Sequence, residues 1–169
     1  ICPDYAFLLN ITNDHLDWHG NISNYINSKL KIFMCQKRNQ FSLVNNKLKK
    51  FFKSKDFKSK LIIPVVKNYI KIKYKIKNYY FKSSINDENM AFVYTLSRLL
   101  KISEKNFLES FNSFVGLNHR YEIFLKKKNI VFINDSKATS FESTKYALSN
   151  SKNVYWILGG LPKKNDKII

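Results

Sequence analysis

Apolar residues in this chain follow two spacings, one typical of strands and the other typical of helices. Short runs dominated by apolar side chains predict strands, and the first of them has the pattern of a strand buried on both faces of a parallel sheet. These runs lie at residues 5–11, 41–44, 61–66, 122–125, 129–133 and 154–158. Pro64 weakens the centre of the third run, because proline has no N–H group to donate to a neighbouring strand.

Apolar residues three or four positions apart predict four helices, over residues 22–33, 87–100, 103–114 and 140–149. The faces expected to be buried are Ile22, Ile26, Leu30 and Phe33; Met90, Val93, Leu96 and Leu100; and Phe107, Phe111 and Phe114. Asp87 is expected to cap the second helix. Thr139 and Glu142 have the T-x-x-E spacing of a capping box, so the fourth helix should begin at about Ser140.

Residues 70–77 alternate apolar residues with lysine, and this period of two predicts a strand with one solvated face. The segment could be an edge strand whose lysines prevent pairing with other chains. Alternatively, residues 67–82 could form a basic ribbon that binds nucleic acid. Proteins that read nucleic acid usually rely on arginine. This chain has three arginines, and its net charge of +18 comes from lysines spread along the whole sequence. The edge strand is therefore favoured, and no nucleic-acid partner is expected.

The order of these elements predicts an α/β fold made of parts of two domains. The segment 116–120 interrupts the pattern, so we expect a boundary between residues 1–115 and 116–169. The second part then reads strand, loop, helix, strand and loop, as at the start of a doubly wound sheet. The sequence starts at Ile1 and stops just after a loop opens at Gly159-Gly160, so it is expected to be a piece of a longer protein.

Composition narrows the setting of the protein. Cys2 and Cys35 are too few for a disulfide framework or a zinc site, so a reducing cytoplasm is expected. No apolar stretch approaches the roughly 20 residues that are needed to cross a bilayer. The sequence therefore predicts no membrane partner.

The loop from Asn134 to Thr139 is the strongest candidate site. It follows the apolar run 129–133 and carries a carboxylate, Asp135, an ammonium, Lys137, and two hydroxyls. Open α/β sheets bind ligands at the carboxyl ends of strands, where the following helix directs free N–H groups toward an anion. An anionic ligand is therefore expected here.

Two other groups of residues each allow two interpretations. Imidazole and carboxylate groups crowd the end of the first run and could bind a divalent cation or simply form a polar loop: Asp14, His15, Asp17 and His19. Asn86 and Asn89 lie three apart at a helix start, where both amides could face an adenine edge, or Asn86 could cap the helix.

Together these segments resemble the Mur ligases over nearly the whole chain. The matching segments are residues 10–17, Tyr25, 28–30, Asn86 with Asn89, 116–120, 134–139 and Gly159-Gly160. The tract from Asp135 to Thr139 resembles the branch of the family that adds D-glutamate. Sister ligases and the folylpolyglutamate synthases carry different residues at this loop.

The resemblance implies an ATP-dependent ligase that joins D-glutamate to UDP-N-acetylmuramoyl-L-alanine in cytoplasmic peptidoglycan synthesis, acting as a monomer. A carboxylate is a poor acyl donor until it is phosphorylated, so ATP and Mg²⁺ form an acyl phosphate that the amine attacks. The fold implied is the later part of a P-loop-type mononucleotide-binding central domain, then the start of a Rossmann-like C-terminal domain. The family's phosphate loop, G-x-x-x-x-G-K-[ST], is absent from these 169 residues. The fragment alone is therefore expected to be inactive.

The resemblance also implies roles for individual residues. His15 would bind Mg²⁺ together with Lys29, the lysine that the family carbamylates. Lys137 would act at the charged centre where nucleotide and acceptor meet. The remaining implied contacts are Asn86 and Asn89 with adenine, Arg120 with the phosphates, Asp135 with the ribose, and Thr139 and Lys163 with the side-chain carboxylate of D-glutamate.

Three positions depart from the family's pattern. Ile85 stands where a histidine is common, Ser140 replaces an asparagine, and Lys164 could take the role of its neighbour Lys163. The alternative functions are another amide ligase of this superfamily, with a different amino acid, and a basic nucleic-acid-binding module.

Overall fold

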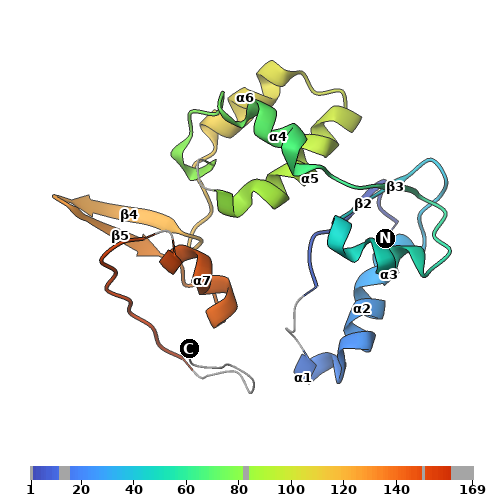
Figure 1. Ribbon diagram of the computed structural model, residues 1–169, viewed down its shortest axis with the longest axis horizontal. Coiled ribbons are helices and arrows are strands. Elements are labelled where there is room, and N and C mark those ends of the chain that lie inside the picture. The colour runs from blue at the N-terminus through green and yellow to red at the C-terminus, as the bar shows by residue number, and fades with distance from the viewer. Residues whose placement is uncertain (1, 12–15, 82–83, 150, 161–169) are drawn as a thin grey trace. The chain divides into compact units, whose positions relative to one another are not determined.

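The computed structural model describes residues 2–11, 16–81, 84–149 and 151–160, which form a mixed α/β structure (Figure 1). The backbone divides into two units, Ile1–Asn112 and Ser113–Ile169, and each is described by itself below. His15 and Lys163 lie outside the described residues, so their predicted roles remain predictions.

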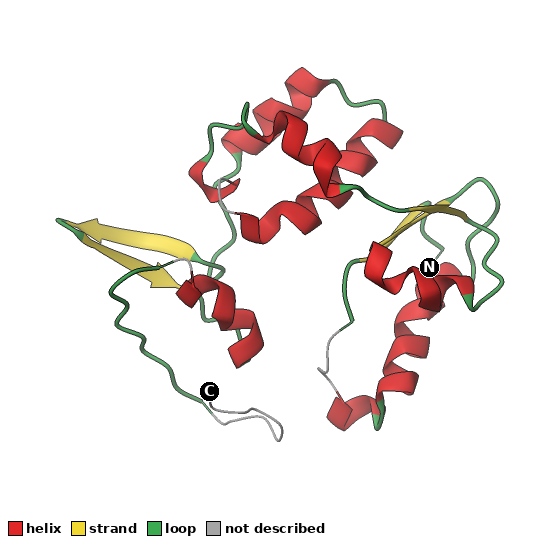
Figure 2. Cartoon of the chain, in the orientation of Figure 1, coloured by secondary structure: helices red, strands yellow, loops and turns green. Residues whose placement is uncertain are grey.

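Three parallel strands form the sheet of the first unit (Figure 2). Its order is β1 (Tyr5–Leu8), β2 (Phe41–Val44) and β3 (Lys60–Ile62). Tyr5 lies opposite Phe41, which in turn lies opposite Lys60. The first three predicted strands are confirmed, although the first ends at Leu8 and the third ends before Pro64, as expected for a residue that cannot donate to the ladder.

The connections between these strands are helical. They are α1 (Leu16–His19), α2 (Ile22–Leu30), η1 (Lys31–Phe33), η2 (Asn46–Leu48) and α3 (Lys49–Lys53). Leu30 and Phe33 are buried against the sheet and Ile26 packs beside them, which confirms most of the predicted helix face. Ile22 at the start of α2 is instead 40% exposed.

A buried polar network fixes the segment that leads into β2. The Ser42 hydroxyl donates to Gln36 Oε1 at 2.6 Å and lies 2.7 Å from the Ser59 hydroxyl. A hydroxyl has one hydrogen, so Ser59 must be the donor to Ser42. Gln36 Nε2 donates to the carbonyl oxygens of Pro3 and Phe41 at 2.8 and 3.1 Å. These pairings remove the cost of burying polar groups beside the sheet.

The predicted strand at 70–77 is wrong, because its first half forms the end of α4 (Val66–Lys73) and the rest forms no strand. The buried side chains are Tyr69, Ile72 and Ile76, at the spacings of three and four that define a helix face, whereas Ile70 is 43% exposed. Burial of this face outweighed the local alternation of lysine with apolar residues. The basic ribbon proposed for nucleic acid is therefore not formed.

Two further helices, α5 (Asp87–Leu99) and α6 (Glu104–Ser113), complete the first unit. The predicted face of α6 is confirmed at Phe107 and Phe111, whose buried rings lie 4.4 Å apart. The predicted face of α5 is wrong, because Val93 and Leu100 are exposed while Ala91 and Phe92 are buried. Phe92 contacts the ring of Phe7 on β1, with 5.7 Å between ring centroids.

Asp87 lies inside the first turn of α5 and does not occupy the capping position before it, so this prediction is also wrong. Its carboxylate Oδ1 instead lies 2.6 Å from the Lys73 ammonium, and both side chains are largely buried. This ion pair joins α4 to α5.

The second unit contains a hairpin of β4 (Glu122–Lys127) and β5 (Ile130–Asn134), then α7 (Phe141–Ser149). The strands are antiparallel, and Lys128, with a φ of 51°, lies in the two-residue turn between them. Both strands were predicted. The strand predicted at 154–158 is wrong, since this segment pairs with no described strand and leaves Tyr155 and Ile157 almost fully exposed.

Across the described ranges, no helix combines the length and the apolar character needed to span a membrane.

We predict that Tyr69→Phe leaves the free energy of unfolding unchanged or raises it by about 1 kcal/mol at neutral pH. Tyr69 is fully buried, and its hydroxyl has no hydrogen-bond partner in the described structure. Desolvation, aided by the negative charge of Asp87, raises the pKa of Tyr69 to about 12. The raised pKa means that the folded state keeps the proton as the unfolded chain ionises, so stability should fall between about pH 10 and 12.

Urea unfolding of the wild-type and Tyr69→Phe forms of the full-length protein, from pH 8 to pH 12, measures both effects. The free energy of unfolding of the variant should fall less at alkaline pH than that of the wild type, because the variant has no tyrosine to ionise at this position. A variant clearly less stable at neutral pH would show that the hydroxyl has a bonding partner.

Candidate functional site

Lys29 returns from α2 to the carboxyl end of β1. Its Nζ donates to the carbonyl oxygen of Asn10 at 3.1 Å and lies 4.9 Å from the centroid of the Tyr25 ring. Both the carbonyl oxygen and the face of the ring are electron-rich and attract an ammonium. Lys29 therefore packs back toward the strand end.

The start of α5 lies at the same edge of this sheet. The Asn45 amide after β2 donates to the Leu8 oxygen of β1 at 2.9 Å, so the two strand ends are adjacent. Glu88 in the first turn of α5 accepts from Lys47 Nζ at 2.8 Å and from Asn45 Nδ2 at 3.4 Å. The carboxyl edge of the sheet thus gathers Lys29 and the helix start that carries the two candidate asparagines.

Asn86 immediately precedes α5, and Asn89 is exposed in its first turn. The backbone of Asn86 is helical, with φ −92° and ψ −1°, and its side chain makes no capping hydrogen bond. The capping interpretation of Asn86 is therefore wrong. The amide remains a candidate ligand contact.

Most of the predicted cation cluster cannot be placed. Asp14 and His15 lie outside the described residues, as does the side chain of Asp17, while the ring of His19 lies 5.1 Å from that of Tyr25. Among the side chains that the structure describes, no three His, Cys, Asp or Glu residues gather closely enough to bind a metal ion.

A pocket of about 540 Å³ in the second unit joins two separate segments of the chain. It is lined by Gly116, Leu117, Asn118, Arg120 and Lys137. Arg120 and Lys137 were predicted separately to contact the phosphates and the charged centre, and here they line the same space. No described carboxylate forms an ion pair with either cation. The pocket is therefore suited to an anionic group.

The turn that presents Arg120 is held in an uncommon conformation. The Arg120 amide donates to the Leu117 oxygen at 3.1 Å, and this closes a four-residue turn. His119, third in the turn, has φ +64°, and Tyr121 has φ +47°. A turn of this kind usually places glycine or asparagine at its third position, because other residues rarely adopt the left-handed region.

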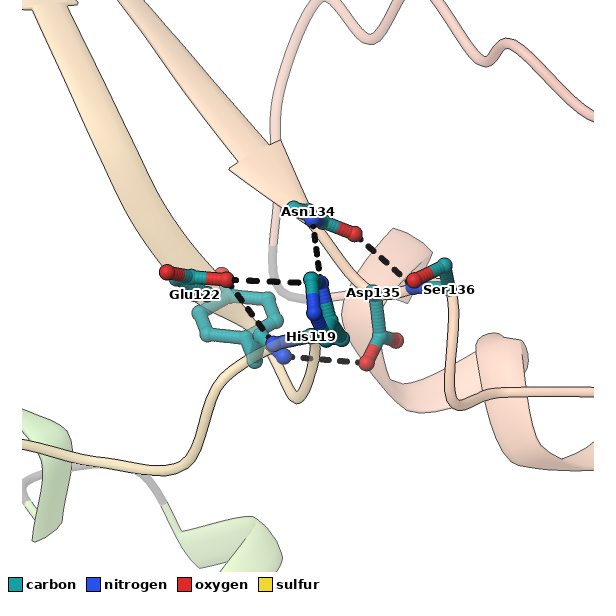
Figure 3. Close-up of polar contacts among 6 residues, drawn as sticks. His119, Glu122, Asn134, Asp135 and Ser136 are labelled. Carbon is teal, nitrogen blue, oxygen red and sulfur yellow. Dashed lines mark hydrogen bonds and ion pairs between the residues drawn. The ribbon is translucent and has the colours of Figure 1, made fainter.

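Side chains around the turn hold it in place (Figure 3). Glu122 Oε2 accepts from the His119 amide at 2.8 Å, and Asp135 Oδ1 accepts from the Tyr121 amide at 2.9 Å. The amide of Lys137 donates to the His119 oxygen at 3.0 Å. The two loops that line the pocket are thus bonded to each other directly.

The His119 ring contacts Asn134 at the end of β5, with 2.8 Å between Nδ1 and Asn134 Nδ2. Asn134 Oδ1 already accepts from the Ser136 amide at 3.1 Å, so the amide nitrogen faces the ring. Nδ1 then accepts from the Asn134 amide, and Glu122 Oε2 lies 3.8 Å from the same ring nitrogen. No local pattern in the sequence indicated this contact, because its partners are 15 residues apart.

Ser140 and Ser143 cap the start of α7, whereas the side chain of Glu142, the predicted partner of Thr139, lies outside the described ones. The Ser143 amide donates to Ser140 Oγ at 3.2 Å, and the Ser140 amide donates to Ser143 Oγ at 3.1 Å. These reciprocal bonds satisfy two free N–H groups at the helix start. Ser140 is the cap, and Thr139 lies exposed just before it, on the side of the candidate loop.

Residues 1–107 of this chain match the family model described as the Mur ligase middle domain. The chain belongs to the Mur ligase family. This finding confirms the resemblance that the sequence motifs indicated.

Two curated Mur ligase relatives are each named UDP-N-acetylmuramoylalanine--D-glutamate ligase. The relative from Wolbachia sp. subsp. Brugia malayi (strain TRS) is 35% identical over 95% of this chain and 35% of its own length. The relative from Rickettsia prowazekii (strain Madrid E) is 35% identical over 94% of this chain and 40% of its own length. The chain thus spans well under half the length of these relatives.

Solved Mur ligase structures share the fold. The crystal structure of MurF ligase from Thermotoga maritima in complex with ADP aligns with a TM-score of 0.62 at 18% identity, over 88% of this chain and 39% of that one. MurF from Acinetobacter baumannii aligns with a TM-score of 0.57 at 14% identity, over 89% of this chain and 38% of that one. At such low identity, the likeness supports the mixed α/β Mur ligase fold alone.

We predict that Ser140→Ala weakens the start of α7 in this Mur ligase chain by about 1 kcal/mol, because the helix loses its capping oxygen. Amide hydrogen exchange at Ser143 and Thr144 should become several-fold faster. Thr139→Ala is the matched control and should leave both rates unchanged. If exchange instead became faster only in Thr139→Ala, the result would support the predicted capping box of Thr139 with Glu142.

Proposed function

We propose that this chain is part of an ATP-dependent ligase that joins D-glutamate to UDP-N-acetylmuramoyl-L-alanine in cytoplasmic peptidoglycan synthesis. The observation that carries the proposal is the pocket where Arg120 and Lys137 meet, formed in part by the Asp135-Ser136-Lys137-Ala138-Thr139 tract. The names of the relatives and their identity over nearly the whole chain support D-glutamate as the amino acid.

Arg120 and Lys137 supply the charge that phosphoryl transfer requires. A carboxylate must approach a negatively charged phosphate, and two cations in one pocket lower the repulsion between them. We assign Arg120 to the phosphates of ATP and Lys137 to the centre where charge develops. Asp135 keeps lone pairs free beyond its bond to Tyr121, so it can accept from a ribose hydroxyl.

The remaining contacts are assigned from the resemblance. Asn86 and Asn89 would bind adenine, and Thr139 and Lys163 would bind the side-chain carboxylate of D-glutamate. In the full-length protein, residues 1–115 would belong to the P-loop-type central domain and residues 116–169 to the start of the Rossmann-like C-terminal domain.

We assign His15 and a carbamylated Lys29 to Mg²⁺, which would neutralise phosphate charge when bound. The hydrogen bond that Lys29 makes is compatible with a carbamate. A carbamate nitrogen keeps one N–H, so its bond to the Asn10 oxygen, now 3.1 Å long, can persist while two new oxygens become available to a cation.

We predict that the full-length protein, incubated with ¹³C-bicarbonate, gives a carbamate carbon signal in its NMR spectrum that disappears in Lys29→Ala. Lys31→Ala is the matched control, since Lys31 is an exposed lysine nearby. A signal that survives in Lys29→Ala, or its absence from the wild type, would contradict the assignment.

We also predict that the full-length protein forms ADP over many turnovers only when UDP-N-acetylmuramoyl-L-alanine and D-glutamate are both present. Lys137→Ala should lower kcat/KM by roughly a hundredfold or more, as expected when a cation that stabilises developing charge is removed. The matched control is Lys127→Ala, an exposed lysine on β4, which should keep wild-type activity.

Activity with meso-diaminopimelate or L-alanine in place of D-glutamate would support the alternative amide ligase and overturn the choice of amino acid. Residues 1–169 alone should show no D-glutamate-dependent ATP hydrolysis above that of their Lys137→Ala variant, because they lack the phosphate loop.

A further inference from the structure

Two cations in one pocket repel each other, so the fold must hold them there. Arg120 and Lys137 both line the pocket, and neither forms an ion pair with a described carboxylate. Without an anion between them, repulsion favours separation of their two loops. Some other interaction must keep the loops together before the anion binds.

His119 provides that interaction, because three groups from different segments bind it. Glu122 at the start of β4 accepts from its amide at 2.8 Å, and Asn134 at the end of β5 contacts its ring at 2.8 Å. Its carbonyl oxygen accepts from the amide of Lys137 at 3.0 Å. A residue other than glycine keeps a left-handed backbone conformation only where several surrounding contacts hold it, and such residues are often found at ligand sites.

The two nearby carboxylates bind backbone amides on either side of Arg120. Glu122 accepts a hydrogen bond from the amide of His119, and Asp135 accepts one from the amide of Tyr121. Hydrogen bonds from N–H groups to carboxylates are stronger than those to neutral acceptors. The carboxylates thus fix the backbone of Arg120 and leave its guanidinium available to a ligand.

We propose that Glu122 and Asn134, acting through His119, are positioning residues that hold Arg120 beside Lys137 for a phosphate group. The proposal rests on the proposed function, since the phosphate is taken to be that of ATP. Neither residue needs to touch the nucleotide. Their loss should weaken ATP binding through Arg120, whereas a role confined to hairpin stability would not depend on Arg120.

The test is the equilibrium dissociation constant for ATP with the full-length protein, measured by titration calorimetry for single and double variants. Glu122→Ala should weaken ATP binding roughly tenfold, the effect of losing one hydrogen bond to a charged group. Glu122→Gln should weaken it less, because the amide oxygen still accepts from His119. Adding Glu122→Ala to Arg120→Ala should cause no further weakening, because the two residues act as one unit.

Glu109→Ala is the matched control, since Glu109 is an exposed carboxylate on α6. It should bind ATP like the wild type. Circular dichroism establishes that each variant folds, and if Glu122→Ala does not, Asn134→Ala replaces it in the same cycle.

Binding by Glu122→Ala within twofold of the wild type, or losses that simply add in the double variant, would overturn the positioning role. If the proposed function itself were wrong, different results would be observed. In that case the wild-type protein would bind no ATP, or would form no ADP with D-glutamate.

Discussion

The hydrogen bond from the amide of Lys137 to the carbonyl oxygen of His119 is the interaction on which the candidate site depends. It joins the turn before the β4–β5 hairpin to the loop after it, and so brings two cations from segments far apart in sequence to one pocket. A backbone bond is well suited to this task because it leaves both charged side chains available. The carboxylates of Glu122 and Asp135 then fix the backbone around it.

In the first unit, strand pairing brings segments that are distant in sequence together. Parallel pairing of β1 with β2 places their carboxyl ends together, where the Asn45 amide bonds to Leu8. Lys29 returns to this edge from α2, and Glu88 ties the start of α5 to it. Ligand sites of open α/β sheets occur at this edge. In both units, hydrogen bonds between separate segments fix the position of a loop that carries candidate site residues.

Much of the fold could be predicted because its signals are local. The apolar run 41–44 became β2, the stripe of Phe107 and Phe111 became the buried face of α6, and the runs 122–125 and 129–133 became β4 and β5. The segment 70–77 was misread because two periods overlap in it. The segment forms a helix because this buries Tyr69, Ile72 and Ile76. Such burial depends on the tertiary structure and cannot be read from the local sequence.

The candidate site was predictable in its residues but not in its geometry. The strand-end loop singled out Asp135 and Lys137, and the family resemblance added Arg120; all three lie on the two bonded loops. It could not indicate that His119 joins those loops, since its contacts depend on the register of a hairpin. Likewise the apolar run 154–158 fits a strand, yet a strand forms only where a partner edge is available.

A crystal structure of the full-length protein with a non-hydrolysable ATP analogue would show whether Arg120 and Lys137 bind phosphate together. We expect the Arg120 guanidinium and the Lys137 ammonium both to lie within roughly 3.2 Å of phosphate oxygens, with the carbonyl oxygen of His119 still bonded to the amide of Lys137. Phosphates bound elsewhere, with both cations facing solvent, would contradict this expectation.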